Sequence, residues 1–326
     1  MRLVDDRDAD AEASEFDLIR AVLGSRTITA PLLRVDAGDD CAVFAPAPLA
    51  IGNDLSVEGT HFLRDWITLA EVGWRAGAAA LSDLAAMAAE PAAVLLGLCL
   101  DPGTNSEGAL AIARGVIDAA EATGAGLAGG DVSRGPVLAL DVVAIGRCDA
   151  PRTRAGARAG DALWVTGRLG AAATAVRAWR EGGEPSERAR AAFASPRPRV
   201  QEALWLAGRG ASAMIDVSDG LSSDAAHLAD ASGLAAVLDA ARIPVAEDAG
   251  ARLEDALHGG EDYELLVALP AASGGVDTAA FEARFGIPLT RIGVVRPGAG
   301  AYLRDADGES RPLPRGGFDH LGGTTA

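Results

Sequence analysis

The sequence contains no lysine, and all 29 of its basic residues are arginine. A Walker P-loop needs a Gly-Lys-Ser/Thr sequence, so this class of nucleotide-binding protein is excluded. A Schiff base also needs a lysine amine, which excludes ordinary pyridoxal-phosphate enzymes. If the protein handles nucleotide phosphates, it must bind them through metal ions, backbone amides and arginine.

Cysteine pairs and long apolar runs are also lacking. The three cysteines (Cys41, Cys99 and Cys148) lie far apart and form no Cys-x-x-Cys motif, which argues against a zinc knuckle or a disulfide framework. The longest apolar runs, such as VLLGLCL, are too short to span a bilayer. The acidic first twenty residues do not resemble a signal peptide. We therefore expect a reduced, cytoplasmic location and no membrane partner.

The chain of 326 residues is strongly acidic, with a formal net charge of -17. This charge argues against nucleic acid or an anionic membrane as the main partner. It suits a protein that gathers carboxylates around cations. Because 49% of the residues are hydrophobic, we expect a substantial core. The length fits one large domain or two ordinary ones.

Alternating strands and helices are predicted along the first half, which indicates an α/β (or α+β) fold. Strands are predicted at 49–57, 93–100 and 136–146, and helices at 69–89 and 106–122. Thr68 and Glu71 have capping-box spacing at the start of the first helix, and Pro91 is the expected stop. A stretch rich in Arg, Gly and Pro at 147–161 predicts a domain boundary, with domains at 1–150 and 151–326.

The second half repeats this alternation. Strands are predicted at 162–167, 213–217 and 263–269, with helices after Gly170 and at 221–232, the latter closed by Gly233. The segment 181–199 is predicted to be a polar linker or loop, and 271–280 a surface loop that leads into a helix.

Six short segments place a carboxylate after small residues, at the expected edge of an element. They are GDDCAV (Asp39, Asp40), GNDLSVEGTH (Asp54), LSDLAAM (Asp83), GGDVSRG (Asp131), IDVSDGLSSD (Asp216, Asp219) and GGEDYELL (Glu261, Asp262). Each segment alone is also compatible with ordinary turn or cap chemistry. Clustered carboxylates without histidine or cysteine favour a hard cation, and Mg²⁺ is the default.

Asp83 has the weakest purely structural explanation. Between Arg75 and Glu90 the only polar residues are Ser82 and Asp83, which predicts a helix that is buried almost all round. A lone carboxylate there would be costly unless it were paired or bound to a cation. The acids of IDVSDG also stand where a strand is followed by a glycine turn and a helix, which is where ligands bind in α/β sheets.

At these residues the chain resembles the thiamine-monophosphate kinase family over nearly its whole length. GDDCAV, DLSVEGTHF, LSDLAAMAAEP, GGDVSRG, IDVSDGL and GGEDYELL resemble family motifs in order, and GFDH stands at the expected C-terminal place. The resemblance implies a two-domain fold of the aminoimidazole-ribonucleotide-synthetase type. The N-terminal domain would bind ATP and Mg²⁺ and pair its sheet with a second copy in a homodimer. The C-terminal α/β domain would complete the active site.

The resemblance also implies an activity and residue roles. The γ-phosphoryl group of ATP would pass directly, with several Mg²⁺ ions, to thiamine monophosphate, which gives thiamine diphosphate without a covalent nucleophile. The implied metal ligands are Asp39, Asn53, Asp54, Asp83, Asp131, Asp216 and Asp219. The implied ATP contacts are Gly130, Asp131, Arg154 and Ser218, and the implied contacts of the thiamine phosphate are His61, Glu261 and Phe318.

The sequence departs from the family pattern at three positions. Gly52 and Asn53 stand where the family has Ser-Thr or Thr-Thr, and Ala88 replaces the usual glycine after the methionine. No aromatic residue between Asp101 and Ala111 is available to stack on adenine.

Two alternatives follow: another ATP-dependent enzyme of the same superfamily, or a catalytically weak homologue that binds nucleotide or metal. Two of these enzymes, selenophosphate synthetase and the hydrogenase-maturation dehydratase, need a reactive cysteine near one terminus, and we find none there.

Overall fold

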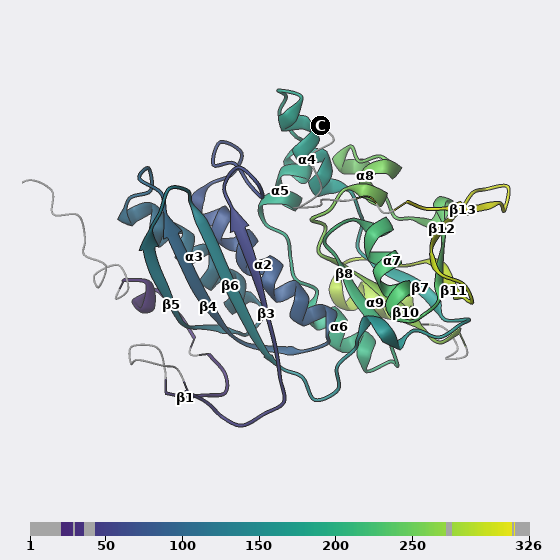
Figure 1. Ribbon diagram of the computed structural model, residues 1–326, viewed down its shortest axis with the longest axis horizontal. Helices are drawn as coiled ribbons and strands as arrows, with labels where there is room; N and C mark the ends of the chain where they lie inside the picture. The colour runs from purple at the N-terminus through teal and green to yellow at the C-terminus, as the bar shows by residue number, and fades with distance from the viewer. Residues whose placement is uncertain (1–20, 29, 36–42, 272–275, 315, 317–326) are drawn as a thin grey trace, which may run out of the picture. The chain divides into compact units, whose positions relative to one another are not determined.

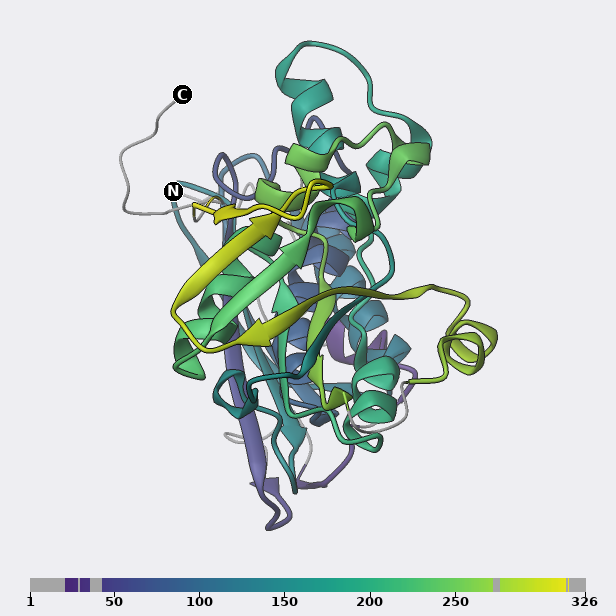
Figure 2. The same cartoon turned by 90° about the vertical axis from the view of Figure 1, so that its right-hand side faces the viewer.

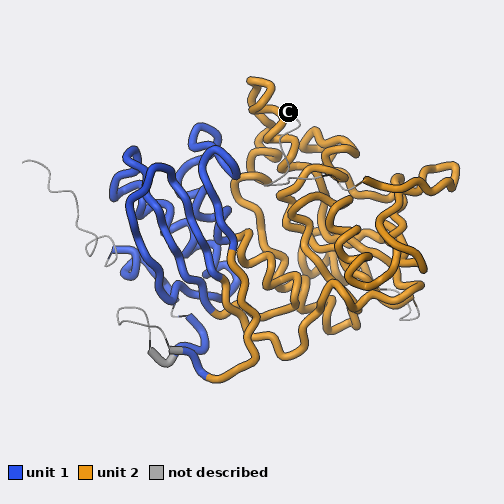
Figure 3. The backbone as a smooth tube through the Cα atoms, viewed as in Figure 1, with its two compact units in different colours: residues 1–45, 54–77, 93–143 blue, residues 46–53, 78–92, 144–326 orange. Residues whose placement is uncertain are grey.

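The computed structural model describes residues 21–28, 30–35, 43–271, 276–314 and 316 (Figure 1). They fall into two compact units (Figure 3), of which unit 1 comprises 1–45, 54–77 and 93–143, and unit 2 comprises 46–53, 78–92 and 144–326. Both units are discontinuous in sequence, because the chain passes between them inside three strands and a helix of the N-terminal half. The predicted division between residues 150 and 151 stays a prediction.

A four-stranded sheet in the order β3-β6-β4-β5 organises the N-terminal half. Its strands are β3 (Leu49–Val57), β4 (Glu90–Leu100), β5 (Gly126–Arg134) and β6 (Ala139–Arg147). The helices α2 (Leu69–Ala86) and α3 (Ser106–Ala122) lie along one face of this sheet (Figure 1). The predicted strand at 49–57 and the predicted helix at 106–122 are confirmed. β4 and β5 run parallel, so their carboxyl ends lie at the same edge.

Glycines allow α2 and α3 to pack with their backbones in contact. A Cβ atom added to Gly73 would lie 1.9 Å from the carbonyl oxygen of Ile112, and one added to Gly115 would lie 2.0 Å from that of Ala70. No side chain fits at either position, so the two helices approach each other more closely than larger residues would allow.

The two ends of α2 follow different rules. At its start the capping box is confirmed, because the Thr68 N–H donates to Glu71 Oε2 over 2.8 Å and the Glu71 N–H donates to Thr68 Oγ1 over 3.3 Å. The predicted end at residue 89 is wrong. Ala88 takes a left-handed conformation with φ 52°, and the Ala89 N–H donates to the Leu84 carbonyl over 2.9 Å, which closes the helix at Ala86. Pro91 lies inside β4.

A seven-stranded sheet in the order β13-β12-β9-β11-β7-β10-β8 forms the centre of unit 2 (Figure 2). Its strands are β7 (Ala162–Thr166), β8 (Ala213–Val217), β9 (Ala235–Asp239), β10 (Glu264–Leu269), β11 (Leu289–Arg296), β12 (Gly300–Arg304) and β13 (Ser310–Pro312). The strands pair antiparallel except β9 and β12. The predicted strands at 162–167, 213–217 and 263–269 are confirmed to within one residue.

Both faces of this sheet are covered, because its strands alternate apolar side chains between two cores. Ile215 and Val217 of β8 pack with Leu221 on one face, whereas Met214 packs with Leu206 and Phe281 on the other. The helices of unit 2 are α4 (Ala171–Arg180), α5 (Glu187–Ala194), α6 (Val200–Ala207), α7 (Leu221–Ala231), α8 (Leu253–His258) and α9 (Thr278–Phe285). No helix among the described residues is long and apolar enough to cross a membrane.

Helix α5 corrects the prediction that 181–199 is a linker or loop. Ser186 caps the helix by accepting a hydrogen bond from the Ala189 N–H over 3.2 Å. Ala189 and Phe193 are buried, and the Phe193 ring meets the Trp179 ring edge-on at 5.4 Å. The polar composition hid this short apolar stripe. The predicted helix after Gly170 and the closure of α7 by Gly233, with φ 65°, are confirmed.

Candidate functional site

Among the residues that the structure describes, four of the predicted site residues lie in unit 1. Asp54 is half-buried in the middle of β3, and Asp131 is exposed within β5, so both lie inside strands rather than at the edges where the sequence placed them. Gly130 pairs with Leu96 of β4, and a Cβ atom added to it would lie 2.1 Å from the Leu96 carbonyl oxygen. Glycine is therefore needed at 130 for the fold itself, whatever else it binds.

His61 lies in the loop that leads from β3 to α2, and its ring is oriented by the backbone. Its Nδ1 accepts a hydrogen bond from the Val57 N–H over 3.0 Å. Because an amide N–H can only donate, the neutral imidazole must carry its proton on Nε2. The carbonyl of His61 accepts a hydrogen bond from Arg75 Nη2 over 3.4 Å. The Nε2–H of this tautomer is a hydrogen-bond donor, the type of group that suits an anionic ligand.

The end of β8 and the last turns of α2 form the carboxylate region of unit 2. Asp216 is 3% exposed and accepts a hydrogen bond from Ser82 Oγ over 2.8 Å. Asp83 is half-buried, so the expectation that α2 is buried almost all round is wrong at this residue. Its Oδ2 lies 3.4 Å from the position that a Cβ atom on Gly52 would occupy. The Asp83 carboxylate therefore lies against β3.

Burial and mutual repulsion raise the pKa values of two carboxyl groups here. Burial raises the pKa of Asp216. Burial, followed by the charges of Asp216 and Asp219, raises the pKa of Asp224 to about 8. The charge of Arg154 acts in the opposite direction on both groups. A cation at this position would be favoured, because it would remove the penalty of holding these carboxylates together.

Sequence reasoning missed Asp224. It is 2% exposed in the first turn of α7, and its Oδ2 accepts a hydrogen bond from the Asp219 N–H over 3.2 Å. In sequence it looked like an ordinary acid near a helix N-terminus. Its spacing of five residues from Asp219, across the turn at Gly220, was the available signal.

The structure brings Ser218 and Glu261 together. The Glu261 N–H donates to the Ser218 carbonyl over 2.8 Å, and a Cβ atom on Gly260 would lie 2.2 Å from that same oxygen. Glu261 and Tyr263 both take left-handed conformations, with φ 74° and 50°. Two such residues so close together store backbone strain, which is typical of functional loops. The predicted ATP contact and the predicted substrate contact are therefore neighbours.

Two carboxylates, Asp262 and Glu264, hold the part of the chain that follows Glu261. Asp262 accepts the Gly170 N–H with both carboxylate oxygens at 2.9 Å, and burial raises its pKa. Glu264, which is 4% exposed, accepts a hydrogen bond from Thr166 Oγ1 over 2.6 Å. It also accepts two from Arg199, from Nε over 2.8 Å and from Nη2 over 2.6 Å. This two-pronged ion pair fixes the start of β10 directly after the loop.

The donor chemistry fits Mg²⁺ that shares its coordination with phosphate oxygens. The predicted ligands offer oxygen atoms only. The carboxylates of unit 2 have too little positive charge near them to offset their mutual repulsion. Among the residues that the structure describes, no group of three or more His, Cys, Asp or Glu side chains could hold a metal ion by itself. Mg²⁺ commonly takes only one or two carboxylates and completes its shell with water and substrate phosphates. Asp39 and Phe318 lie outside the described residues.

Two family models and several curated relatives match most of the chain. The family model described as "AIR synthase related protein, N-terminal domain" matches residues 38–148, and its C-terminal counterpart matches 158–305. A thiamine-monophosphate kinase of Escherichia coli K12 is 33% identical over 94% of this chain and 98% of that protein. One from Mycobacterium tuberculosis is 34% identical over 78% and 80%.

Solved structures agree with this placement. The crystal structure of thiamine-monophosphate kinase from Stenotrophomonas maltophilia K279a covers 92% of this chain and 98% of its own, with 34% identity and a TM-score of 0.79. The structure described as AaThiL complexed with AMPPCP and TMP covers 94% and 97%, with 28% identity and a TM-score of 0.73. Hydrogenase maturation protein HypE in complex with ATP, at 19% identity and a TM-score of 0.75, shows the shared fold alone. The chain therefore belongs to the thiamine-monophosphate kinase family, within the AIR synthase related proteins.

Proposed function

We propose that the protein phosphorylates thiamine monophosphate with ATP, and that the products are thiamine diphosphate and ADP. The observation that carries this proposal is the structure of a relative that binds AMPPCP and TMP together, to which this chain is 28% identical over 94% of its length. The ordered carboxylate motifs and the pairing of Ser218 with Glu261 support it from within this chain.

The carboxylates of this chain would hold Mg²⁺, which neutralises phosphate charge when it is bound. The proposed metal ligands are Asp39, Asn53, Asp54, Asp83, Asp131, Asp216 and Asp219. The proposed ATP contacts are Gly130, Asp131, Arg154 and Ser218. We assign ATP and Mg²⁺ binding and dimerisation to residues 1–150, and completion of the site to 151–326.

The substrate contacts proposed are His61, Glu261 and Phe318. Because His61 Nδ1 accepts the Val57 N–H, its Nε2–H is the group that would donate to a phosphate oxygen. Direct in-line transfer needs positioning and charge neutralisation and no covalent nucleophile. The proposed role of His61 is therefore to bind and orient the acceptor.

We also propose a homodimer that forms through β3. Three apolar side chains of this edge strand are exposed: Leu49 by 38%, Ile51 by 64% and Leu55 by 53%. An unpaired edge with an apolar row is a surface that proteins normally cover. A second copy of the same strand would cover it with a matching surface. A cytoplasmic location fits the cysteines Cys99 and Cys148, which form no disulfide.

The test is to incubate the purified protein with ATP, Mg²⁺ and thiamine monophosphate. We expect thiamine diphosphate and ADP in equal amounts, with no phosphorylated protein on the pathway. Asp83→Asn keeps the shape of the side chain and removes its charge, so we expect turnover to fall about 100-fold or more with an unchanged fold.

Isolation of a phosphoprotein intermediate would contradict direct transfer. ATP binding without thiamine diphosphate would indicate a homologue that binds nucleotide without this activity. Normal turnover by Asp83→Asn would show that Asp83 does not belong to the metal site.

A further inference from the structure

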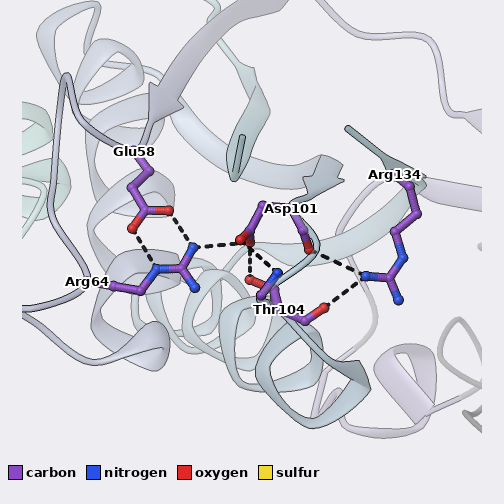
Figure 4. Close-up of polar contacts among 6 residues, drawn as sticks. Glu58, Arg64, Asp101, Thr104 and Arg134 are labelled. Carbon is purple, nitrogen blue, oxygen red and sulfur yellow. Dashed lines mark hydrogen bonds and ion pairs between the residues drawn. The ribbon is translucent and has the colours of Figure 1, made fainter. Parts of the chain in front are cut away.

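Arg64 connects the His61 loop to the carboxyl ends of the parallel strands. Its guanidinium group bonds to Glu58, with Nε donating to Oε1 over 2.6 Å and Nη2 donating to Oε2. The same Nη2 donates to Asp101 Oδ1 over 3.1 Å (Figure 4). Glu58 directly follows β3 and Asp101 directly follows β4. One side chain therefore links two segments that are far apart in sequence.

The far end of this network is equally well anchored. Asp101 accepts hydrogen bonds from Thr104 Oγ1 and from the Gly103 N–H, the latter over 2.9 Å. Arg134, the last residue of β5, donates through Nη1 to the carbonyl oxygens of Asp101 and Thr104 over 3.4 and 3.1 Å (Figure 4). Asp101 is thus fixed from three sides and makes a rigid support for Arg64.

The charges of Arg64 and Asp101 persist at any ordinary pH. The hydrogen bonds to Glu58 and then to Asp101 raise the pKa of Arg64, and the Thr104 hydroxyl is the main group that lowers the pKa of Asp101. The side chain of Arg64 is 33% exposed, so its ion pairs are partly screened by water. We therefore expect the network to contribute more to local geometry than to the stability of the whole fold.

The loop that Arg64 closes is short and contains His61. Glu58 and Arg64 are six residues apart, and His61 lies midway between them. Phe62, which is 2% exposed, and the bond from Gly59 N–H to the Phe62 carbonyl over 2.9 Å fix the centre of the loop. The Arg64 side chain ties the end of this loop to Asp101, the residue directly after β4. The Val57 backbone sets the orientation of the His61 ring, and the Arg64 tie would set the position of the loop that carries it.

We propose that Arg64 is a positioning residue for the acceptor phosphate, and that it acts by holding the His61 loop against the end of β4. This inference rests on the proposed function. It assigns Arg64, Glu58 and Asp101 to acceptor binding and not to ATP binding.

The test compares Arg64→Gln, His61→Ala and the double variant by steady-state kinetics. We expect Arg64→Gln to raise the KM for thiamine monophosphate about tenfold, with the KM for ATP changed less than about twofold. In the His61→Ala background the same substitution should add less than about twofold, because the two residues act through one contact. Arg64→Lys should rescue only in part, since an ammonium group lacks the planar fork that bonds Glu58.

Asp118→Asn is the matched control, because it removes an exposed ion pair with Arg114 on α3 of the same unit. It should leave all kinetic constants unchanged. If Arg64→Gln does not fold, Asp101→Asn provides the same comparison, because it weakens the bond that ties the loop to the end of β4 and leaves Arg64 bonded to Glu58.

Full additivity of Arg64→Gln and His61→Ala, an unchanged KM for thiamine monophosphate, or equal effects on both substrates would overturn the inference. Calorimetric binding of thiamine monophosphate gives the same comparison without turnover. If the wild-type protein neither binds nor phosphorylates thiamine monophosphate, the proposed function fails and the inference fails with it. If only the variants behave otherwise than expected, the inference fails alone.

Discussion

Gly52 and Asn53 are consecutive in β3 but face opposite sides of the strand. Burial alternates along β3, with Gly52 and Asp54 half-buried and Asn53 exposed beside Ile51 and Leu55. The Asp83 carboxylate lies next to Gly52. From the sequence, Asn53 was the expected substitute for the family's hydroxyl ligand. In the structure it is Gly52 that faces Asp83, and the metal role of Asn53 stays a prediction.

Gly52→Ser and Asn53→Thr separate the two possibilities. A serine Cβ at 52 would lie 3.4 Å from Asp83 Oδ2, in ordinary contact, so its hydroxyl could join the same metal shell. We expect Gly52→Ser to lower the Mg²⁺ concentration for half-maximal turnover about two- to threefold, because Mg²⁺ tolerates misplaced ligands poorly. Asn53→Thr should change it less. A larger decrease in Asn53→Thr would identify Asn53 as the ligand position.

Asp224 should destabilise the metal-free protein as the pH rises. Its folded-state pKa of about 8 lies far above the ordinary value of 3.8, so below about pH 4 both states are protonated and there is no penalty. Between about pH 4 and 8 the unfolded chain ionises while the folded protein retains the proton, and stability is lost.

We therefore expect Asp224→Asn to stabilise the metal-free protein by about 1–3 kcal/mol at pH 8, and by much less at pH 4.5. Urea unfolding in the presence of a chelator at both pH values measures this difference. Added Mg²⁺ and ATP should reduce the difference in unfolding free energy between the variant and the wild type at pH 8. An equal effect at the two pH values would show that packing, and not charge, explains the change.

The C-terminal end of α2 is a strained element boundary. Ala88 occupies the left-handed position at which helices usually place glycine, and the family has glycine there. A Cβ atom in this conformation costs about 1 kcal/mol relative to glycine.

Ala88→Gly should therefore raise the free energy of unfolding by about 1 kcal/mol, less the extra entropy that glycine gives the unfolded chain. Ala86→Gly, two residues earlier and still helical, is the control and should lower it by about the same amount. Chemical denaturation of the two variants beside wild type decides the matter. Destabilisation by both would mean that Ala88 makes packing contacts worth more than its strain.

Element boundaries with local chemical causes were predictable from the sequence, and those with tertiary causes were not. The Thr68 capping box and the helix end at Gly233 can each be recognised from a few neighbouring residues. The end of α2 could not be predicted in this way, because alanine at position 88 adopts a left-handed conformation that normally indicates glycine. Helix α5 was hidden because a polar segment needs only Ala189 and Phe193 to reach the core.

The candidate site shows the same limit. The motifs located the carboxylates along the chain, whereas the burial of Asp216 and Asp224 depends on which helix end covers β8. No local pattern predicts that Arg64 would reach Asp101, 37 residues away.

At the scale of the whole molecule, the exposed apolar row on β3 predicts self-association. Ile51, which is 64% exposed, is the most accessible member of the row. We expect Ile51→Glu to weaken the dimer by about 30-fold or more, because a charge would have to be buried at the centre of the interface. Light scattering after size-exclusion chromatography measures the mass. Ile51→Val should leave the mass unchanged, and a wild-type protein that is already monomeric at micromolar concentration contradicts the dimer.

The Arg199–Glu264 ion pair makes one part of this acidic molecule indifferent to ionic strength. Its side chains are 16% and 5% exposed, so dissolved ions cannot approach and screen the attraction. The strained backbone of Glu261 is attached directly to this pair through Asp262 and Tyr263. Concentrated salt should therefore loosen the contacts of phosphate ligands while it leaves the loop that receives them in place. This chain, with its net charge of -17, can thus lose affinity for phosphate ligands at high salt concentration and still keep the conformation of this loop.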